Sequence, residues 1–230
     1  MAFEEQQPFD PASFEHIPVL LNECLTGLAI DPAGTYLDGT AGGAGHSRQI
    51  ALRLDAAKGG RLISLDQDPD AVQTARSRLA GLPATVVQIN FRYAGQALEQ
   101  LGIEKINGAL RDLGVSSHQL DDAARGFSYR ADAPLDMRMS QQGETAADLV
   151  NTESREELAR ILRDYGEEPY AWQIAGKIVE TRETAPILTT LQLADLVASA
   201  MPPAERRKNK NPSRRSFQAL RIPVNHAVDA

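Results

Sequence analysis

The chain has 230 residues, of which 42% are hydrophobic, and this is enough for one sizeable core or two small ones. Its net charge of −7 argues weakly against a nucleic-acid-binding domain, because such domains tend to be basic. No apolar run approaches the roughly 20 residues that cross a bilayer, and the acidic start MAFEEQQPFD does not resemble a signal peptide. The single cysteine, Cys24, cannot form an internal disulfide and matches no metal-ligand spacing. We therefore expect a cytoplasmic protein with no membrane segment and no metal.

The first half of the chain alternates short apolar segments with helix-like segments. Strands are predicted at 35–38, 61–66, 84–89 and 106–114, and helices at 46–57, 69–81 and 94–102. This alternation is typical of an α/β fold in which right-handed crossovers connect the strands of a parallel sheet.

The second half changes character and carries apolar residues at three- and four-residue spacing. Helices are predicted at 154–166, 170–183, 188–201 and 213–228, and Ser154 with Glu157 matches a capping box. We expect three regions: a core at 1–139 that contains the four strands, a helical subdomain at 140–212, and a terminal helix at 213–230 that returns to the core.

The segment TYLDGTAGGAGHSRQI, residues 35–50, joins the first strand to the first helix through a glycine-rich loop. Glycines let a backbone approach a ligand closely, but these do not have the G-x-G-x-x-G spacing of a dinucleotide site. Asp38 ends the strand, where we expect it to face the ligand and to repel a pyrophosphate. A cationic ligand such as S-adenosylmethionine fits this loop better.

Two further acids end neighbouring strands, which places them at one edge of a parallel sheet. Asp66 ends the second strand, where a carboxylate can accept hydrogen bonds from both ribose hydroxyls; the alternative is a helix cap, a role that Asp68 fits better. Asp112 follows the fourth strand. Three carboxylates directed into one crevice repel one another unless a cation or a hydrogen-bond donor lies between them. Their placement therefore indicates a functional site. Phe91, past the third strand, either contacts an adenine or belongs to the core.

The run ERRKNKNPSRR, residues 205–215, contains six basic residues and one acid. It is either a solvated loop or a local phosphate-binding patch on an acidic protein.

Six motifs occur in order along the chain and carry a family resemblance: HIPVLLNECL (16–25), DGTAGGAGHS (38–47), DLGVSSHQLDDAARGFSYRADAPLDMRM (112–139), YGEE (165–168), PILTTLQLA (186–194) and SFQALRIPVN (216–225). Together they resemble the bacterial MraW/RsmH family, the cytosine-N4 methyltransferases of 16S ribosomal RNA. The resemblance covers nearly the whole chain, and the 28-residue central motif is its most specific part.

The resemblance implies a Rossmann-like methyltransferase sheet with an inserted helical subdomain, S-adenosylmethionine as methyl donor, and the small ribosomal subunit as partner. Carried over by position, the donor-binding residues are Ala44, Gly45, His46, Asp66, Phe91, Asp112 and Gln119. His46 begins the helix after the loop, where its neutral ring or its backbone N–H could meet the methionine carboxylate.

The chemistry suggests a catalytic role for Asp112 as well. A cytosine amine is a weak nucleophile because its lone pair is delocalised, and a hydrogen-bond acceptor at Asp112 would localise that pair and take the proton. The resemblance instead makes Asp112 a donor-binding residue, and both roles stay open. Phe127 or Tyr129 could hold the target base by stacking, or could pack the subdomain.

The sequence also departs from the family pattern. Family members continue past SFQALRI with more strands, so we expect a sheet that lacks its last strands and has strand 4 at an exposed edge. Arg111 stands where an apolar strand residue is expected, and Pro223 should interrupt the last helix. Two other readings remain open: a donor-dependent enzyme that methylates a protein or small molecule, and an inactive RNA-binding remnant.

Overall fold

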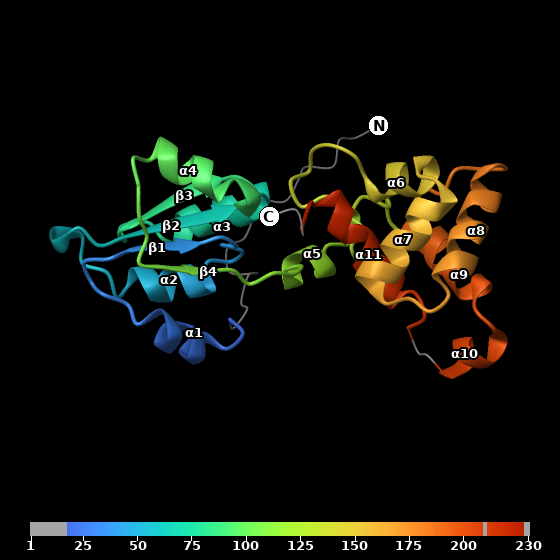
Figure 1. The fold of residues 1–230 in the computed structure, drawn as a ribbon, viewed down its shortest axis with the longest axis horizontal. Coiled ribbons are helices and arrows are strands. Elements are labelled where there is room, and N and C mark those ends of the chain that lie inside the picture. Colours follow the sequence, from blue (N-terminus) through green and yellow to red (C-terminus); the bar gives the residue numbers. More distant parts are fainter. Residues whose placement is uncertain (1–17, 209–210, 228–230) are drawn as a thin grey trace, which may run out of the picture. The chain divides into compact units, whose positions relative to one another are not determined.

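The computed structural model describes residues 18–208 and 211–227. Residues 16 and 17 of the first motif, Lys210 of the basic run and the end of the expected terminal helix therefore lie outside the described residues. The chain divides into two compact units, Met1–Gly114 and Val115–Ala230. The first contains a sheet and the second contains helices (Figure 1). The core predicted from the sequence extends to residue 139, whereas the structure groups Val115 onward with the helices.

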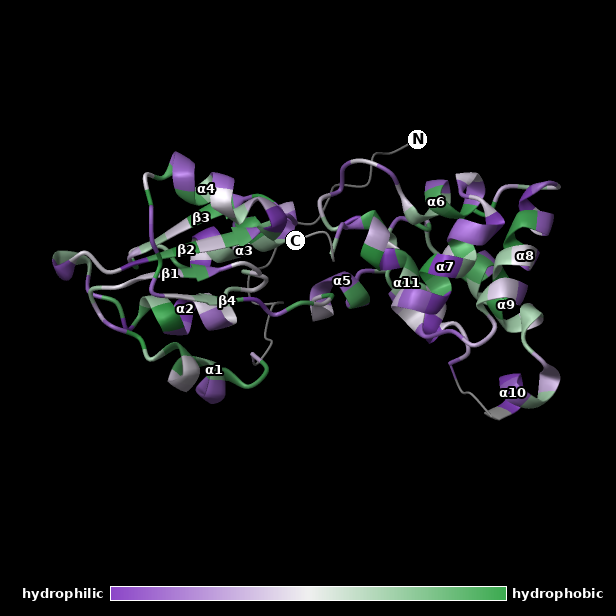
Figure 2. Cartoon of the chain, in the orientation of Figure 1, coloured by the Kyte–Doolittle hydropathy of each residue, from purple (hydrophilic) through white to green (hydrophobic). Residues whose placement is uncertain are grey.

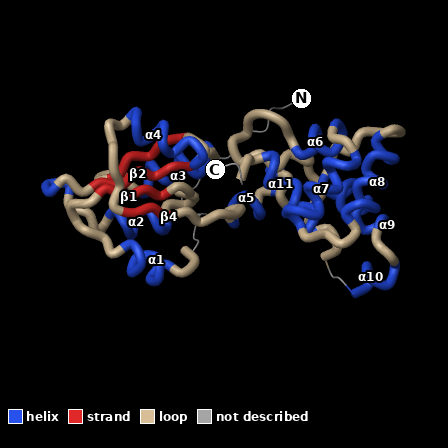
Figure 3. The backbone as a smooth tube through the Cα atoms, in the orientation of Figure 1, coloured by secondary structure: helices blue, strands red, loops and turns tan. Residues whose placement is uncertain are grey.

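The first unit contains a four-stranded parallel sheet, drawn in red in Figure 3, with the order β3-β2-β1-β4. The strands are β1 (Thr35–Asp38), β2 (Arg61–Asp66), β3 (Ala84–Gln88) and β4 (Gly108–Leu110). Asp38, at the end of β1, lies level with Ser64 on β2 and with Leu110 on β4. The predicted α/β class is confirmed, and β1 and β2 have the predicted bounds.

Helices cover both faces of this sheet, and Figure 1 shows α2 and α4 on opposite sides. The helices of the unit are α1 (Leu21–Leu28), α2 (Gly45–Ala51), α3 (Pro69–Arg78) and α4 (Ala94–Gln100), with 3-10 turns η2 (Ala56–Lys58) and η3 (Phe91–Tyr93). Because side chains alternate along a strand, Tyr36 packs in one core with α2 and α3, and Leu37 packs in another with α4. Burial on both faces is typical of a parallel sheet.

Strand β4 is the edge strand beside β1, as expected, but it has three residues instead of nine. Its Gly108 lies against α1, since an added Cβ would come 3.0 Å from Leu28 Cδ2. Arg111 comes after the strand and is exposed, so it is not the misplaced strand residue that the sequence suggested. Among the described residues, no strand follows β4; only an isolated bridge joins Pro134 and Thr189.

The second unit is a helical bundle with one hydrophobic core. Its helices are α5 (Ser117–Asp121), α6 (Ala146–Thr152), α7 (Arg155–Gly166), α8 (Ala171–Arg182), α9 (Thr190–Ala200), α10 (Pro203–Lys208) and α11 (Arg214–Val224), with the 3-10 turn η4 (Ala123–Arg125). Hydrophobic and hydrophilic residues alternate around α7 and α11 (Figure 2). The core includes Leu158, Leu162 and Phe217. At Gly166 an added Cβ would come 2.7 Å from the Arg215 carbonyl oxygen, so glycine permits the close approach of α7 and α11.

Two local predictions concern the helices of this unit, and the first needs correction. Ser154 does cap α7, because its side chain accepts a hydrogen bond from Glu157 N, but the Glu157 carboxylate binds Arg160 instead of reaching back to complete the box. Helix α11 contains Pro223 and ends one residue later, at Val224, before the predicted end of the helix at 228. A proline removes one backbone hydrogen bond of a helix, so this early end agrees with the predicted interruption. Helix α11 packs against α7, within the helical unit.

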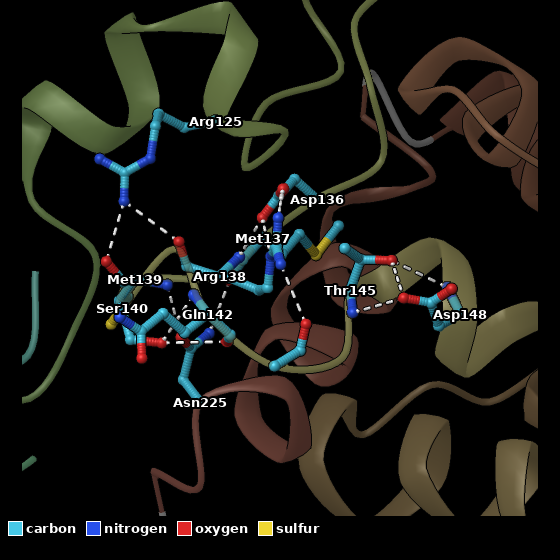
Figure 4. Close-up of polar contacts among 11 residues, drawn as sticks. Arg125, Asp136, Met137, Arg138, Met139, Ser140, Gln142, Thr145, Asp148 and Asn225 are labelled. Atoms are coloured by element: carbon cyan, nitrogen blue, oxygen red, sulfur yellow. Dashed lines mark hydrogen bonds and ion pairs between the residues drawn. The ribbon is translucent and has the colours of Figure 1, made fainter.

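The end of the central motif is held in place by buried polar contacts with α11 and η4 (Figure 4). Asn225 Nδ2 donates to the Met137 carbonyl at 2.7 Å, and Asn225 Oδ1 accepts from Met139 N at 2.7 Å. Arg125 donates to the carbonyls of Arg138 and Met139 at 3.1 Å. These bonds hold Met137, fully buried at φ 62°, in the left-handed conformation that glycine favours.

Candidate functional site

The glycine loop runs from the end of β1 into α2 in a conformation that small residues permit. Gly42 has a φ of +49°, and Ala44, which precedes α2, has a φ of 60°. At Gly45 an added Cβ would lie 2.4 Å from Pro18 Cγ, so a larger residue would displace the chain segment before α1. Of the residues predicted to bind the methyl donor, Gly45 therefore needs to be glycine because of Pro18, and Ala44 is small because it is buried.

Asp38 is fully buried and binds the loop from the inside. Its Oδ2 accepts a 2.6 Å hydrogen bond from Ser47 Oγ on α2, and its Oδ1 accepts one of 3.0 Å from Thr40 N. Ser47 Oγ also lies 2.6 Å from Ser64 Oγ on β2. Burial raises the pKa of Asp38, against the opposing effect of the hydrogen bonds from Ser47 and Thr40. The expectation that Asp38 faces a ligand is wrong, because its carboxylate joins β1, α2 and the loop internally.

Asp66, at the end of β2, is the acid that contacts the glycine segment of the loop. Its Oδ2 accepts a 2.8 Å hydrogen bond from Gly42 N, and its Oδ1 accepts one of 2.9 Å from Asp68 N. Burial raises the pKa of Asp66 to about 6, although both hydrogen bonds oppose this shift, and the nearby Asp38 adds to it. Asp68 fills the alternative role of helix cap, because its side chain accepts a hydrogen bond from Asp70 N at the start of α3.

His46 is buried beside the same loop, not on the surface. Its Nε2 lies 3.0 Å from the Val19 carbonyl oxygen, which can only accept, so Nε2 carries the proton. The ring N–H is thus used to anchor the segment before α1. While this bond is present, the ring N–H is not available to a ligand, and the backbone N–H of His46 is the group that could donate a hydrogen bond to a ligand carboxylate. This is one of the two roles that the sequence suggested for His46.

Phe91 and Arg111 meet above the first glycine of the loop. Phe91 lies in η3 after β3, and the Arg111 guanidinium carbon lies 5.5 Å from the centroid of its ring. An added Cβ on Gly39 would come 2.9 Å from Arg111 Cγ and 3.3 Å from Phe91 Cβ. Phe91 is half-buried, so it is not a fully enclosed core residue.

Asp112 is exposed, and its main chain is fixed to the glycine loop. The Asp112 N–H donates a 2.7 Å hydrogen bond to Thr40 Oγ1. Within the described parts of the chain, the Asp112 carboxylate has no hydrogen bond or ion pair. The structure thus gathers Gly42, Asp66 and Asp112 around one loop, with Asp112 as the acid whose carboxylate remains available.

The remaining predicted residues lie in the helical unit. Gln119 is buried at the start of α5, where it completes a capping box: its side chain accepts from Ser116 N, and its N–H donates to Ser116 Oγ. Phe127 is buried in the helical core, so it does not present a face to a target base. Tyr129 packs edge-on against Phe217, with ring centroids 5.0 Å apart. Of the two roles suggested for Phe127, stacking on a base or packing inside the subdomain, the structure therefore supports packing.

No helix in the described parts of the chain is long and apolar enough to cross a bilayer. The same residues contain no group of three or more His, Cys, Asp or Glu side chains placed to hold a metal ion.

The glycine loop and its acids belong to a sequence with many relatives. The model of the MraW methylase family matches residues 13–230. The chain belongs to the MraW methylase family. It is 53% identical to "Ribosomal RNA small subunit methyltransferase H" of Paenibacillus sp. (strain JDR-2), over 94% of this chain and 71% of that protein. The protein with the same name in Brevibacillus brevis is 49% identical, over 95% of this chain and 70% of that protein. The one in Geotalea daltonii is 51% identical, over 93% of this chain and 69% of that protein.

Membership in the MraW family makes the chain a methyltransferase with S-adenosylmethionine as donor. The structure adds four residues whose roles were not predicted from the sequence: Thr40 and Ser47 bind Asp38, Ser64 contacts Ser47, and Arg111 lies over Phe91. Thr40 and Ser47 are part of the loop motif, but no spacing in the sequence shows that they bind Asp38.

Proposed function

We propose that this chain transfers a methyl group from S-adenosylmethionine to the N4 amine of a cytidine in the 16S ribosomal RNA of the small subunit. The main support for this substrate is the 53% identity, over 94% of this chain, to a protein named for the ribosomal RNA of the small subunit. A protein with this substrate works in the bacterial cytoplasm.

The residues of the first unit fit the donor. The loop at Gly42 and Gly45 leaves the backbone bare, and Asp66 places a carboxylate at the strand end beside it. A carboxylate there accepts hydrogen bonds from vicinal ribose hydroxyls and attracts a ligand with a net positive charge. Ala44, His46 and Phe91 complete the proposed donor-binding set of this unit.

Asp112 is the proposed acceptor for the target amine. When bound, S-adenosylmethionine supplies an electrophilic methyl group. The exposed Asp112 carboxylate accepts a hydrogen bond from the amine, which localises the nitrogen lone pair, and then receives the proton that the amine loses on methylation. Because the Asp112 N–H is bound to Thr40, the main chain of this residue is positioned before the substrate arrives.

The RNA is proposed to contact the basic segment, defined as residues 205–215. Residues 203–208 form helix α10, so this part is not the loop that the sequence suggested. Arg206, Arg207, Arg214 and Arg215 are exposed. Exposed arginines bind phosphates in a sequence-independent way and fix the orientation of an RNA.

Mass spectrometry of ribosomal RNA tests the proposal. The chain is expressed in bacterial cells that lack their own cytosine-N4 methyltransferase, and 16S RNA from these cells is digested to nucleosides. We expect N4-methylcytidine with the parent chain, strong loss with Asp112→Asn, and no loss with Asp31→Asn, which changes an exposed acid of the same unit. RNA without N4-methylcytidine, from cells that contain the folded parent chain, would contradict the proposal.

A further inference from the structure

Arg111 spans the carboxyl edge of the sheet. It directly follows β4, whereas Phe91 lies beyond β3, and these two strands are at opposite edges of the described sheet. The Arg111 stem crosses Gly39, where an added Cβ would meet Cγ at 2.9 Å and Cδ at 3.3 Å. Its guanidinium ends over the Phe91 ring, 5.5 Å from the centroid. The contact therefore lies beside Gly39, which directly follows β1.

This placement leaves no space for another ring between the two side chains. A purine stacked between Phe91 and Arg111 needs a separation of roughly 7 Å, which is two van der Waals contact distances. The observed 5.5 Å is shorter. A purine that uses this face of Phe91 must therefore replace the guanidinium, and the cation–π contact is lost when it does.

Arg111 also brings a positive charge beside the proposed donor site. S-adenosylmethionine carries an ammonium, a sulfonium and a carboxylate, so its net charge is +1. Its demethylated product, S-adenosylhomocysteine, has a thioether in place of the sulfonium and is neutral overall. A nearby guanidinium disfavours the cationic ligand relative to the neutral one.

We propose that Arg111 determines the donor affinity and selectivity of this chain: it competes with the purine for Phe91 and disfavours S-adenosylmethionine relative to S-adenosylhomocysteine. The inference rests on the proposed donor site. The half-buried Arg92 provides a comparison, because it lies over Tyr93 at 5.1 Å in the same 3-10 turn as Phe91 but is not among the atoms closest to Gly39.

Calorimetric titration with each ligand tests the inference on the parent chain and on Arg111→Leu, Arg111→Lys and Arg92→Leu. Arg111→Leu should bind S-adenosylmethionine roughly two- to fivefold more tightly, as expected from an exposed cation–π contact. Its affinity for S-adenosylhomocysteine should increase less. The ratio of the two dissociation constants should therefore change in favour of S-adenosylmethionine. Arg111→Lys keeps the charge and should keep the parent ratio, and Arg92→Leu should change neither affinity.

This experiment distinguishes a failure of the inference about Arg111 from a failure of the proposed donor site. If the parent binds the donor and Arg111→Leu binds it equally or more weakly, in a fold shown intact by circular dichroism, the inference about Arg111 is overturned and the donor site stands. If neither the parent nor any variant binds either ligand, the donor site itself is contradicted, and the inference falls with it. If Arg111→Leu binds S-adenosylmethionine and the parent chain does not, the result supports competition between Arg111 and the purine for Phe91.

Discussion

The backbone N–H of Asp112 donates a 2.7 Å hydrogen bond to the hydroxyl oxygen of Thr40. The two residues are 72 positions apart in the sequence and follow neighbouring strands, β4 and β1. Thr40 N in turn donates to the buried carboxylate of Asp38 at 3.0 Å. Through Thr40, the exposed acid proposed for catalysis is connected to the buried acid that holds the glycine loop.

The first prediction concerns this connection. Thr40→Val removes the acceptor of the Asp112 N–H, and we expect methyl transfer to fall about two- to tenfold, equivalent to the 0.5–1.5 kcal/mol of one hydrogen bond. Donor affinity should change little, and Thr40→Ser, which keeps the oxygen, should restore the rate. Single-turnover methylation of small subunits measures this effect. Thr85→Val, on the exposed side of β3, is the control. A serine variant as slow as the valine variant would contradict the positioning role.

The second prediction concerns pH and Asp66. Burial raises the pKa of Asp66 from 3.8 to about 6, so the folded chain holds a proton that the unfolded chain has released between these values. The stability that this proton contributes is present below about pH 3.8 and is lost as pH rises through about 6. Asp66→Asn removes this titration. Urea unfolding at pH 5 and pH 7.5 should show a smaller loss of stability in the variant than in the parent, by roughly 1.4 kcal/mol, because about half of the whole loss occurs below pH 5. An identical loss in both chains would contradict the assignment.

The third prediction concerns the basic segment. If its cations contact phosphates, the affinity for ribosomal RNA falls as salt rises, and each removed cation lowers the slope of log K against log salt by about one unit. Replacing Arg206, Arg207, Lys208 and Lys210 with serine should therefore flatten the slope in a filter-binding titration. Lys58→Ser with Arg61→Ser, in the sheet unit, is the control for removing cations elsewhere on the chain, and it should leave the slope unchanged. An unchanged slope would show that the segment is merely solvated.

The fourth prediction concerns Asn225, whose side chain joins α11 to the central motif. It is buried and bonds Met137, Met139 and the Arg221 carbonyl. Asn225→Ala leaves these groups without their partner, and we expect the helical unit to lose about 2–4 kcal/mol of stability. Thermal or urea unfolding measures the loss, with Gln218→Ala on the exposed side of α11 as control. Equal stability of the two variants would mean that the contact contributes nothing.

The strands β1 and β2 and the longer helices were predictable from the sequence, whereas α1, α5, α6 and α10 were not predicted. The apolar runs of the two strands are bounded by glycine and acidic residues, and these local signals do not depend on the rest of the chain. The sequence also placed Asp66 and Asp112 at strand ends, because parallel strands end at one edge of a sheet. The motifs that identify the family are likewise readable in the sequence alone.

The role of each acid and each aromatic residue, in contrast, depends on the tertiary structure. Asp38 and Asp66 end their strands in the same way, yet Asp38 is enclosed by Ser47 and Thr40 while Asp66 binds Gly42. The same holds for Phe127, which the core encloses, and for Arg111, which leaves the strand and covers Phe91. These outcomes depend on contacts between residues that are far apart in the sequence, and a local pattern carries no information about which distant side chain fills a given space.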